Sequence, residues 1–519
     1  MRKTYLLALL SVVLIAFGFA SCGQSSGYQS VIPAEPVAVV KANVNNLLTK
    51  SEILKDNQIT GLAKNGINEM PENSRELMRK ILADPANSGI DLEQPAFMVV
   101  ENIEQVRGFA LLAVSDIEKL KELVNALDDE SSSLTEKDDY SVLKVNNDNL
   151  AAFDENKLVI AFSQGAFDAT EYMTPDDNAD DKCSELEDFL ASGDDMGLYM
   201  AYKDILRLAE GANAEAFAGI DMEKFKDMKL ICSLNFEAGK AVLKGKMAGS
   251  DELIDAYKKF AADPETDLQK FIPNATYAFM QFGAKEWGKA IEETVALTGE
   301  NNPLEQATAE INKTLKRQGV SQEFSWSLLN SLDGGIIFGV SEIDKTSQMP
   351  IPQMTFVAEC KDDKLFSLIE EIMQKEPGMV KPVADNIYSL GDLYYIGYAD
   401  DKIFVMPKSI YNECYNDGSL KGLASNLSSS KMADKIGNKN GMIVDAKATV
   451  NVIKEMRLAK RRSERAMLDM LNKFDSSSYT VDIDNCEMEW SVFFDDVNAN
   501  SLKQIKDMAV STAIGEAVN

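Results

Sequence analysis

The sequence VIPAEPVAVV at residues 31–40 returns as FIPNATYAFM at residues 271–280, an offset of 240 residues. Four further pairs of segments match in the same order, at an offset that drifts slowly and stands at 245 for the second of these pairs. The four pairs begin at Ala110 and Phe356, at Ala151 and Ile396, at Met196 and Gly441, and at Leu234 and Val481. Five matching blocks in one order predict a tandem duplication, with the first copy at residues 31–265 and the second at residues 271–519.

Each copy contains short apolar or alternating runs that predict β-strands, for example at residues 95–100 and 106–114. Short links rich in Asp, Asn and Gly join the runs, as at residues 146–149 and 154–156, and such links are typical of antiparallel hairpins. Amphipathic helices fall between the hairpins. We therefore predict the α+β class, as two tandem copies of an antiparallel sheet with helices packed on one face.

The clearest helix signal begins at Asn302-Pro303-Leu304-Glu305, where an N-cap residue precedes Pro at the first helical position. Lys316 and Arg317 fall in the expected last turn, and Gly319 follows them. These signals predict a helix over residues 303–317.

The N-terminus has the features of a secretory signal. Met1-Arg2-Lys3 is basic, and residues 6–19 form an apolar run of 14 residues, which is too short to span a bilayer as a permanent helix. The run ends at Phe19-Ala20-Ser21-Cys22, which resembles the lipobox of bacterial lipoproteins. The resemblance implies that residues 1–21 are removed, that Cys22 is acylated with chains such as palmitate, and that residues 22–30 form a lipidated tether. A secretory signal that merely precedes a Cys, or an uncleaved anchor, is the alternative.

The residues after Cys22 bear on where an anchored protein would reside. Lipoproteins retained at the inner membrane usually carry Asp directly after the lipidated Cys, whereas this chain has Gly23. The tether Gln24-Ser25-Ser26-Gly27-Tyr28 also lacks the acidic cluster that marks surface-exported lipoproteins in Gram-negative cells of the Bacteroides type. The resemblance therefore implies an outer-membrane lipoprotein that faces the periplasm rather than the cell surface.

The chain is strongly acidic. It has 53 basic and 83 acidic side chains and a formal net charge of −30, which excludes nucleic acid as a partner. The same charge repels anionic lipid, so the acyl chains on Cys22 rather than the protein surface are expected to hold the protein at the membrane. The hydrophobic fraction of 45% is that of an ordinary globular protein.

The residue types present exclude several classes of enzyme. The chain contains no His, so it has no Ser-His-Asp or Cys-His nucleophile system and no His-containing zinc site. Neither the GxGxxG fingerprint of dinucleotide sites nor a P-loop motif occurs. Hydrolases that need only two carboxylates remain open. Because no catalytic residue, metal site or cofactor site can be identified, we predict a protein that is not an enzyme.

An acidic segment has part of the pattern of a calcium-binding loop. Asp176, Asn178, Asp180 and Glu187 occupy positions 1, 3, 5 and 12 of an EF-hand-like loop. Asp181 stands at position 6, where the sharp turn of such a loop needs Gly. We interpret the segment as a solvated acidic loop, with calcium binding as the alternative.

The cysteines that follow Cys22 are expected to be small, mostly buried residues. They do not fall at equivalent points of the two copies, and none forms a CxxC motif. A disulfide that defined the fold would have been duplicated with it, so at most two incidental bridges are expected. These cysteines are Cys183, Cys232, Cys360, Cys414 and Cys486.

One segment is basic, although the chain as a whole is acidic. Arg457, Arg461 and Arg465 recur at every fourth residue of a helix predicted from Thr449 to Phe474, where they would form a basic stripe beside an apolar face. The stripe is a candidate site for anionic headgroups, an acidic glycan or an acidic partner, and a solvated helix face is the alternative. Many of the 23 methionines fall within apolar periods and are interpreted as core-filling residues, with an adaptable binding groove as the alternative.

The lipobox, the opening from Ile32 to Asn43 and the repeated strand-helix units together resemble an uncharacterised family of large Bacteroides-type lipoproteins, classed as a domain of unknown function. The family supplies no catalytic residues to carry over. We expect a non-enzymatic lipoprotein that binds an unknown protein partner or small ligand, with the groove between the two copies as a candidate site. A carrier of a lipid or other small apolar ligand is the alternative, and it needs more apolar space than its own side chains fill. A carboxylate-based hydrolase is less favoured.

Overall fold

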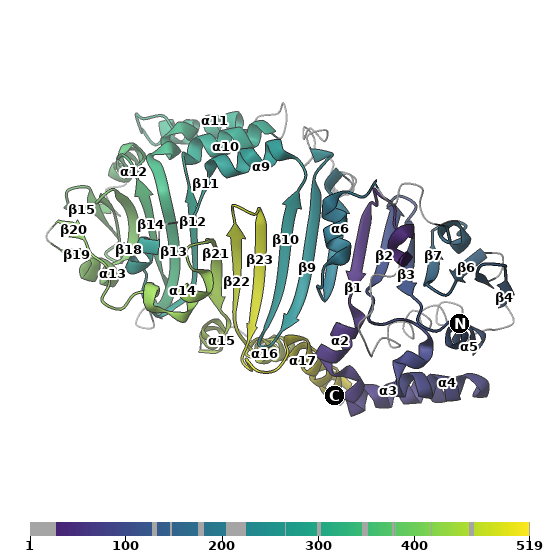
Figure 1. The fold of residues 1–519 in the computed structure, drawn as a ribbon. Helices are drawn as coiled ribbons and strands as arrows, with labels where there is room; N and C mark the ends of the chain where they lie inside the picture. The colour runs from purple at the N-terminus through teal and green to yellow at the C-terminus, as the bar shows by residue number, and fades with distance from the viewer. Residues whose placement is uncertain are drawn as a thin grey trace. The chain divides into compact units, whose positions relative to one another are not determined.

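The computed structural model shows helices and antiparallel strands in alternation along the chain (Figure 1). It describes residues 27–126, 132–145, 148–174, 181–203, 225–264, 266–297, 303–344, 351–375, 378, 380–416, 418–455 and 461–517. These residues form two compact units. The first unit comprises the described residues up to 203, Asp227–Ala248 and the residues from Asp496 onward, and the second unit includes Gly249–Asp495.

In the first unit, antiparallel strands pair side by side in the order β4-β5-β6-β7-β3-β2-β1-β8-β9-β10. These strands are β1 (Ala38–Ala42), β2 (Ala96–Asn102), β3 (Arg107–Ala113), β4 (Ser132–Glu136), β5 (Ser141–Val145), β6 (Asp148–Phe153), β7 (Lys157–Phe162), β8 (Met196–Ala201), β9 (Lys229–Glu237) and β10 (Lys240–Ala248).

In the second unit, antiparallel strands pair in the order β15-β16-β17-β18-β14-β13-β12-β21-β22-β23. These strands are β12 (Thr276–Ala284), β13 (Leu332–Asp344), β14 (Ile351–Cys360), β15 (Val380–Ala384), β16 (Ile387–Leu390), β17 (Tyr394–Ala399), β18 (Lys402–Pro407), β21 (Asn440–Asp445), β22 (Phe474–Asp482) and β23 (Glu487–Phe494). Three two-residue strands complete the set in this unit, namely β11 (Ala261–Ala262), β19 (Tyr415–Asn416) and β20 (Ser419–Leu420).

The two orders agree strand by strand: each begins with short hairpins, passes through a central strand and finishes with a long hairpin. The α+β class predicted from the sequence is confirmed. The shared order also agrees with the duplication inferred from the five matching blocks.

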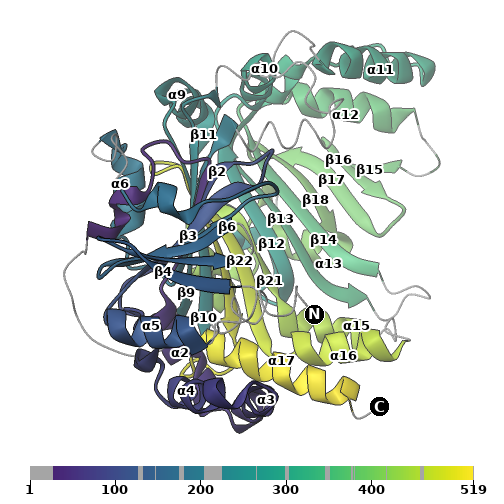
Figure 2. The ribbon, with the colours of Figure 1, turned by 90° about the vertical axis from the view of Figure 1, so that its right-hand side faces the viewer.

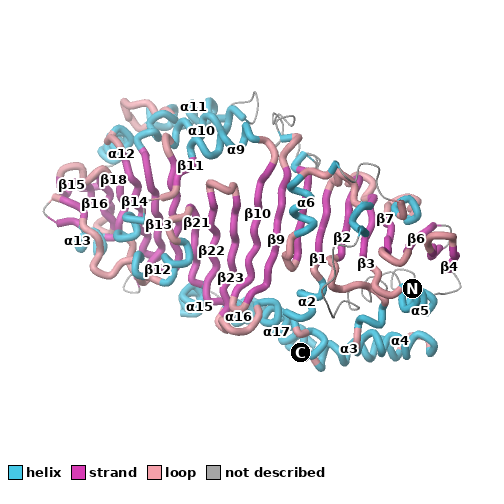
Figure 3. Tube along the Cα trace, viewed as in Figure 1, coloured by secondary structure: helices cyan, strands magenta, loops and turns pink. Residues whose placement is uncertain are grey.

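Helices connect these strands (Figure 3). The described helices of the first unit are η1 (Gly27–Val31), α2 (Val44–Ser51), η2 (Ile53–Lys55), α3 (Asn57–Asn68), α4 (Glu72–Ala83), η3 (Pro85–Ser88), α5 (Ile117–Ala126), η4 (Ala169–Tyr172), α6 (Ser184–Ala191) and α17 (Ser501–Ala517). Those of the second unit are α9 (Asp251–Phe260), η7 (Thr266–Phe271), α10 (Trp287–Leu297), α11 (Pro303–Arg317), η8 (Trp326–Ser331), α12 (Lys364–Gln374), α13 (Lys408–Cys414), η9 (Leu427–Ser429), α14 (Lys431–Ile436), α15 (Ala446–Glu455) and α16 (Arg462–Leu471).

Local sequence signals correctly predicted the positions of several of these elements. The turn between β6 and β7 forms because the carboxylate of Asp154 accepts hydrogen bonds from the backbone N–H groups of Asn156 and Lys157, at 2.7 and 2.9 Å. Helix α11 has the bounds that its flanking Pro and Gly predicted, and Gly319 after it has a φ of 76°, which a residue without a Cβ adopts freely.

The prediction that helices pack on one face of the sheet is wrong for part of each unit. On β7, Val159 packs in a core cluster with Phe189 of α6, whereas Leu158 packs in a different cluster with Leu120 of α5. On β18, Ile403 packs in the cluster that contains Phe366 of α12. These strands are apolar on both faces, so helices are needed on both.

Register corrects one of the matched sequence blocks by one residue. Gly197 of β8 pairs with Lys41 of β1, and Gly441 of β21 pairs with Gln281 of β12. Because Lys41 and Gln281 match at the offset of 240 residues, Gly197 rather than Met196 corresponds to Gly441. A shift of one residue exchanges the two faces of a strand, so this correction decides which side chains of the two copies are equivalent.

The last helix of each copy belongs to the other unit. Helix α9 follows β10 of the first unit but lies in the second, where Lys259 pairs with Glu293 of α10 at 2.9 Å. Helix α17 follows β23 of the second unit but lies in the first, where Lys503 pairs with Glu52, next to the end of α2, at 2.8 Å. The compact units therefore differ from the expected boundaries, 31–265 and 271–519, at both closing helices.

A buried lysine links the central strand of the first unit to a helix end. Lys41 is fully buried, and its ammonium donates hydrogen bonds to the carbonyl oxygens of Phe189 and Ser192, each at 2.7 Å. Burial lowers the pKa of Lys41 to about 8, although the nearby charge of Asp194 opposes that shift. The interaction caps the C-terminus of α6, where the helix dipole favours a cation.

The second unit uses an amide at the matching position. Gln281 is 1% exposed, and its side-chain N–H groups donate to the carbonyl oxygens of Gly437 and Lys439, each at 2.9 Å. These carbonyls lie just beyond α14, the helix that packs on this face. Both copies therefore place a hydrogen-bond donor on the central strand, under the end of a packed helix.

We expect Lys41→Gln to destabilise the first unit much less than Lys41→Met. The Met variant leaves the carbonyl oxygens of Phe189 and Ser192 without this donor in the core, at a cost of about 1–3 kcal/mol each, whereas Gln keeps a donor. Thermal unfolding followed by circular dichroism measures the difference. Equal losses in the two variants would contradict a capping role for the ammonium.

Candidate functional site

The middle strands of the second unit carry apolar side chains on both faces. Along β12, Phe279 lies in a buried core cluster and is 2% exposed, whereas the next residue, Met280, is 37% exposed. Along β21, Ile443 is buried and Met442 is 44% exposed. Because successive side chains of a strand point to opposite faces, one face of these strands packs in the core and the other is open. We call the latter, over β12, β13, β14, β21, β22 and β23, the open face of the second unit.

The side chains of this open face are almost all apolar, and none carries a charge. Trp490 is 52% exposed and Met354 is 42% exposed. The indole N–H of Trp490 donates to the hydroxyl oxygen of Ser477 at 2.7 Å, so these two polar groups satisfy one another. The open face comprises Ala278, Met280, Phe282, Ile336, Phe338, Val340, Met354, Phe356, Met442, Val444, Ser477, Tyr479, Val481, Met488, Trp490 and Val492.

One row of large side chains crosses the open face at right angles to the strands. Each member is the direct pairing partner of the next, and directly opposed side chains in antiparallel strands lie on one face, with Cβ atoms about 4.5–5.5 Å apart. The row runs through six neighbouring strands. From β23 to β14, its members are Trp490, Tyr479, Met442, Met280, Phe338 and Phe356.

A helix covers one end of this row. Phe356 packs against the cluster formed by Phe366 and Met373 of α12 together with Ile403 of β18. Figure 2 shows α10, α11 and α12 near one end of the strands of this unit and α15 and α16 near the other end. The row is therefore closed at Phe356 by α12 and exposed at Trp490.

The first unit has a corresponding open face with smaller side chains. On β2, Met98 is 44% exposed between Phe97 and Val99, which are both buried in the core. Its row passes through the positions that match the row of the second unit, from β10 to β3. The members are Gly245, Cys232, Leu198, Val40, Met98 and Ala110.

The interpretation of the methionines as core-filling residues is therefore wrong for several of them. Met98, Met280, Met354 and Met442 all lie on the open faces and are between 37% and 44% exposed. Methionine is flexible and polarisable, and it recurs on surfaces that adapt to different apolar ligands.

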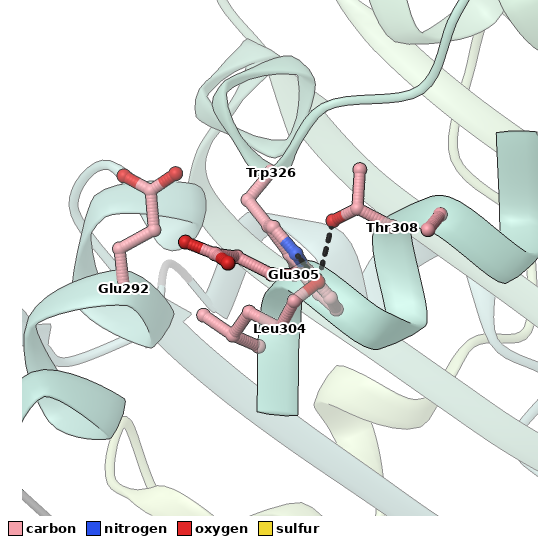
Figure 4. Close-up of a pocket in the computed structure, with 6 residues that line it drawn as sticks. Glu292, Leu304, Glu305, Thr308 and Trp326 are labelled. Atoms are coloured by element: carbon pink, nitrogen blue, oxygen red, sulfur yellow. Dashed lines mark hydrogen bonds between the residues drawn. The ribbon is translucent and has the colours of Figure 1, made fainter. Parts of the chain in front are cut away.

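A separate pocket of about 500 Å³ lies among α10, α11 and η8 (Figure 4). Glu292, Glu305 and the ring of Trp326 contribute to its lining. The indole N–H of Trp326 and the hydroxyl of Thr308 both donate to the carbonyl oxygen of Leu304, at 3.4 and 2.6 Å. Catalytic carboxylates are held by supporting hydrogen bonds, whereas the hydrogen bonds identified around this pocket in the described chain go to Leu304 instead of the two glutamates.

The predicted basic stripe does not form on a single helix. Arg461 has an extended backbone, with φ −83° and ψ 155°, and is the N-cap of α16. The expected helix from Thr449 to Phe474 is therefore divided into α15 and α16. Arg465 is exposed on α16, and Arg457 lies outside the described residues.

The remaining predicted sites fall partly outside the described residues. The expected signal and Cys22 precede residue 27, and residues 175–180 of the acidic loop are not described. Glu187 of that loop pattern lies in α6. Cys183, Cys232, Cys360, Cys414 and Cys486 are free thiols, and the last three are buried.

Among the described residues, no group of three or more Cys, Asp and Glu side chains is arranged to hold a metal ion. No helix in this part of the chain combines the length and apolar character needed to cross a membrane.

Comparison with protein families shows the family to which the chain belongs. The model of the domain of unknown function DUF4836 matches residues 28–411. This region includes strands β1 to β10 of the first unit and β12 to β18 of the second. The chain belongs to the DUF4836 family. The resemblance to a family of unknown function is thereby confirmed, and the matched region of this DUF4836 protein contains both copies of the opening block.

Other comparisons add little to this DUF4836 chain. No curated protein matches it. Among solved structures, it is similar to crystal form III of TP0453, with 8% identity and a TM-score of 0.25 over 44% of this chain and 82% of that chain. A TM-score this low supports no conclusion about fold or function.

We expect substitutions at two adjacent residues of β12 to have very different effects on stability. Phe279→Ala removes a buried ring and is expected to cost about 3–5 kcal/mol. Met280→Lys changes an open-face residue and is expected to cost less than about 1 kcal/mol. Urea unfolding of the two variants measures the difference, and a large loss for Met280→Lys would show that this face is packed rather than open.

Proposed function

We propose that this protein is a membrane-tethered, non-enzymatic lipoprotein that binds apolar ligands on its open faces. The open face of the second unit carries the proposal, because a soluble protein rarely exposes contiguous apolar surface of this kind without a ligand or partner. Among the functions predicted from the sequence, this observation favours the carrier of a lipid or other apolar ligand over the binding of an unspecified protein partner.

The arrangement of polar groups supports an apolar ligand. Protein interfaces carry about one hydrogen bond per 100–200 Å² of buried surface. On the open face, the polar side chains are Ser477, Tyr479 and Trp490, which all lie on β22 and β23. The part over β12, β13 and β21 offers methyl, methylene, thioether and phenyl groups, which can pair with a ligand that has no hydrogen-bonding atoms.

The proposed location rests on the sequence. The lipobox ending at Cys22 and the Gly that follows it favour an outer-membrane anchor that faces the periplasm, and the cell surface is less favoured. The tether is shorter than the expected residues 22–30, because η1 begins at Gly27 and Tyr28 is buried in the core of the first unit. Residues 22–26 can extend at most about 18 Å, so the binding faces would stay close to the membrane. Lipid molecules and acylated proteins are both present there.

A catalytic function has less support. The chain contains no His, and the carboxylate pair of Glu292 and Glu305 has no supporting hydrogen-bond network in the described structure. A carboxylate-based hydrolase therefore remains the less favoured alternative, and the proposal includes no cofactor or metal.

We expect the neutral fluorescent probe N-phenyl-1-naphthylamine to bind the protein and to lose most of its fluorescence enhancement in the double variant Met280→Lys/Met442→Glu. The two new charges lie directly opposite each other on β12 and β21, so they can pair while making the open face polar. Titration of the probe measures the effect.

The matched control is Val383→Glu/Leu393→Lys. These residues are 48% and 59% exposed, on β15 and in the turn before β17, and neither belongs to the open face. The control should bind the probe as the unmodified protein does. Equal binding by both double variants would remove the open face of the second unit as the site.

We expect Cys22→Ala to move the protein from the membrane fraction to the soluble periplasmic fraction. The substitution removes the only residue of the lipobox that can carry acyl chains, and the acidic body has no attraction of its own to anionic lipid. Cell fractionation and mass spectrometry of the N-terminal peptide test the expectation. An unmodified Cys22 in the native protein would overturn the anchor.

A further inference from the structure

We infer that the open face of the second unit holds a single long acyl chain, stretched across the strands along the row from Trp490 to Phe356, with its polar head at Trp490. This inference rests on the proposed function and specifies the ligand class and its direction on that face.

The length of the row suits such a chain. Six neighbouring strands at about 4.8 Å spacing give a row of about 24 Å. The hydrocarbon core of a bilayer is about 30 Å thick, so one layer of acyl chains accounts for about 15 Å. A membrane acyl chain of about 15 Å therefore fits within the row of about 24 Å and crosses about four of its six strands, whereas a compact apolar molecule would contact fewer strands.

The width of the row also suits a linear molecule. Each member of the row is the direct pairing partner of its neighbours on adjacent strands, so the row runs from β23 to β14 without a charged residue. The two central members are methionines, Met442 and Met280, which are directly paired and 44% and 37% exposed. Their flexible side chains can follow the shape of an alkyl chain.

The chemistry of the two ends gives the direction. At β23, Trp490 is more than half exposed and hydrogen-bonded to Ser477, and Tyr479 lies beside it. Trp and Tyr favour the boundary between apolar and aqueous surroundings. At β14, Phe356 packs under α12 in a hydrophobic cluster with Phe366 and Met373. The head is therefore expected at β23, with the chain directed toward β14.

Charge argues against a second copy of the protein as the occupant. The chain has a formal net charge of −30, so two copies repel one another at low ionic strength. A protein segment would also bring backbone N–H and C=O groups to a surface that has few groups to pair with them, and unpaired buried polar groups are costly. An acyl chain brings no such groups.

Two measurements with the full-length mature protein test the inference. The first is a series of monoacylglycerols of increasing chain length, which compete with N-phenyl-1-naphthylamine. If the chain lies along the row, affinity should rise about tenfold for every two methylenes added and level off when the chain exceeds the row. Affinity that does not depend on chain length would overturn the inference.

The second measurement uses Trp490 as a local reporter. In a Trp287→Phe/Trp326→Phe background it is the only tryptophan of the chain. Stearic acid with a nitroxide at carbon 5 should quench its fluorescence several-fold more strongly than stearic acid with a nitroxide at carbon 16. Equal quenching, or stronger quenching from carbon 16, would overturn the proposed direction.

The same variants separate this inference from the proposed function. Met280→Lys/Met442→Glu should abolish quenching, and Val383→Glu/Leu393→Lys should leave it unchanged. Probe binding without chain-length dependence would contradict the acyl chain but keep an apolar ligand site. Absence of binding by the probe and by every monoacylglycerol would contradict both.

Discussion

Burial of one face of the central strands is the interaction on which each unit depends. In the second unit, Phe279, Ile337, Val357 and Phe404 form a core with the helices that pack on the same side, and Ile443 completes it. The opposite sides of the same strands are nearly as apolar, but the described helices cover only part of them. The strands carry more apolar surface on this side than the described helices cover, and the uncovered part is the physical basis of the proposed site.

The sequence predicted the α+β class, its strands and its hairpins, because apolar alternation and turn residues are local signatures. It could not predict the open face. A strand that is apolar on both sides reads as a continuous hydrophobic run, and runs such as YAFM at residues 277–280 look the same whether both faces are buried or one is exposed. The position of Met280 within such a run therefore does not distinguish a core residue from one on the open face. The break between α15 and α16 was missed for a similar reason, because helical spacing continues through Arg461 although its backbone is extended.

The two units have the same strand order but different chemistry at matching positions. Lys41 and Gln281 both pair with carbonyl groups at a helix end, one as a buried cation and the other as a neutral amide. On the open faces, Gly245 stands where the second unit has Trp490, and Ala110 stands where it has Phe356. The frameworks are thus conserved in topology, and the surfaces have diverged in the volume of their side chains, so the two faces need not select the same molecules.

The exchange of closing helices has a consequence for biosynthesis. Helix α17 belongs to the first unit but is made last, after every strand of the second. Domains usually fold in order from the N-terminus as the chain emerges, yet here the first unit lacks its final helix until translation is complete. Lys506, which pairs with Asp56 at 3.0 Å, joins the two extremes of the described chain. A prematurely ended chain would leave the surface beside α2 uncovered, which makes any truncated product recognisable to proteases and chaperones.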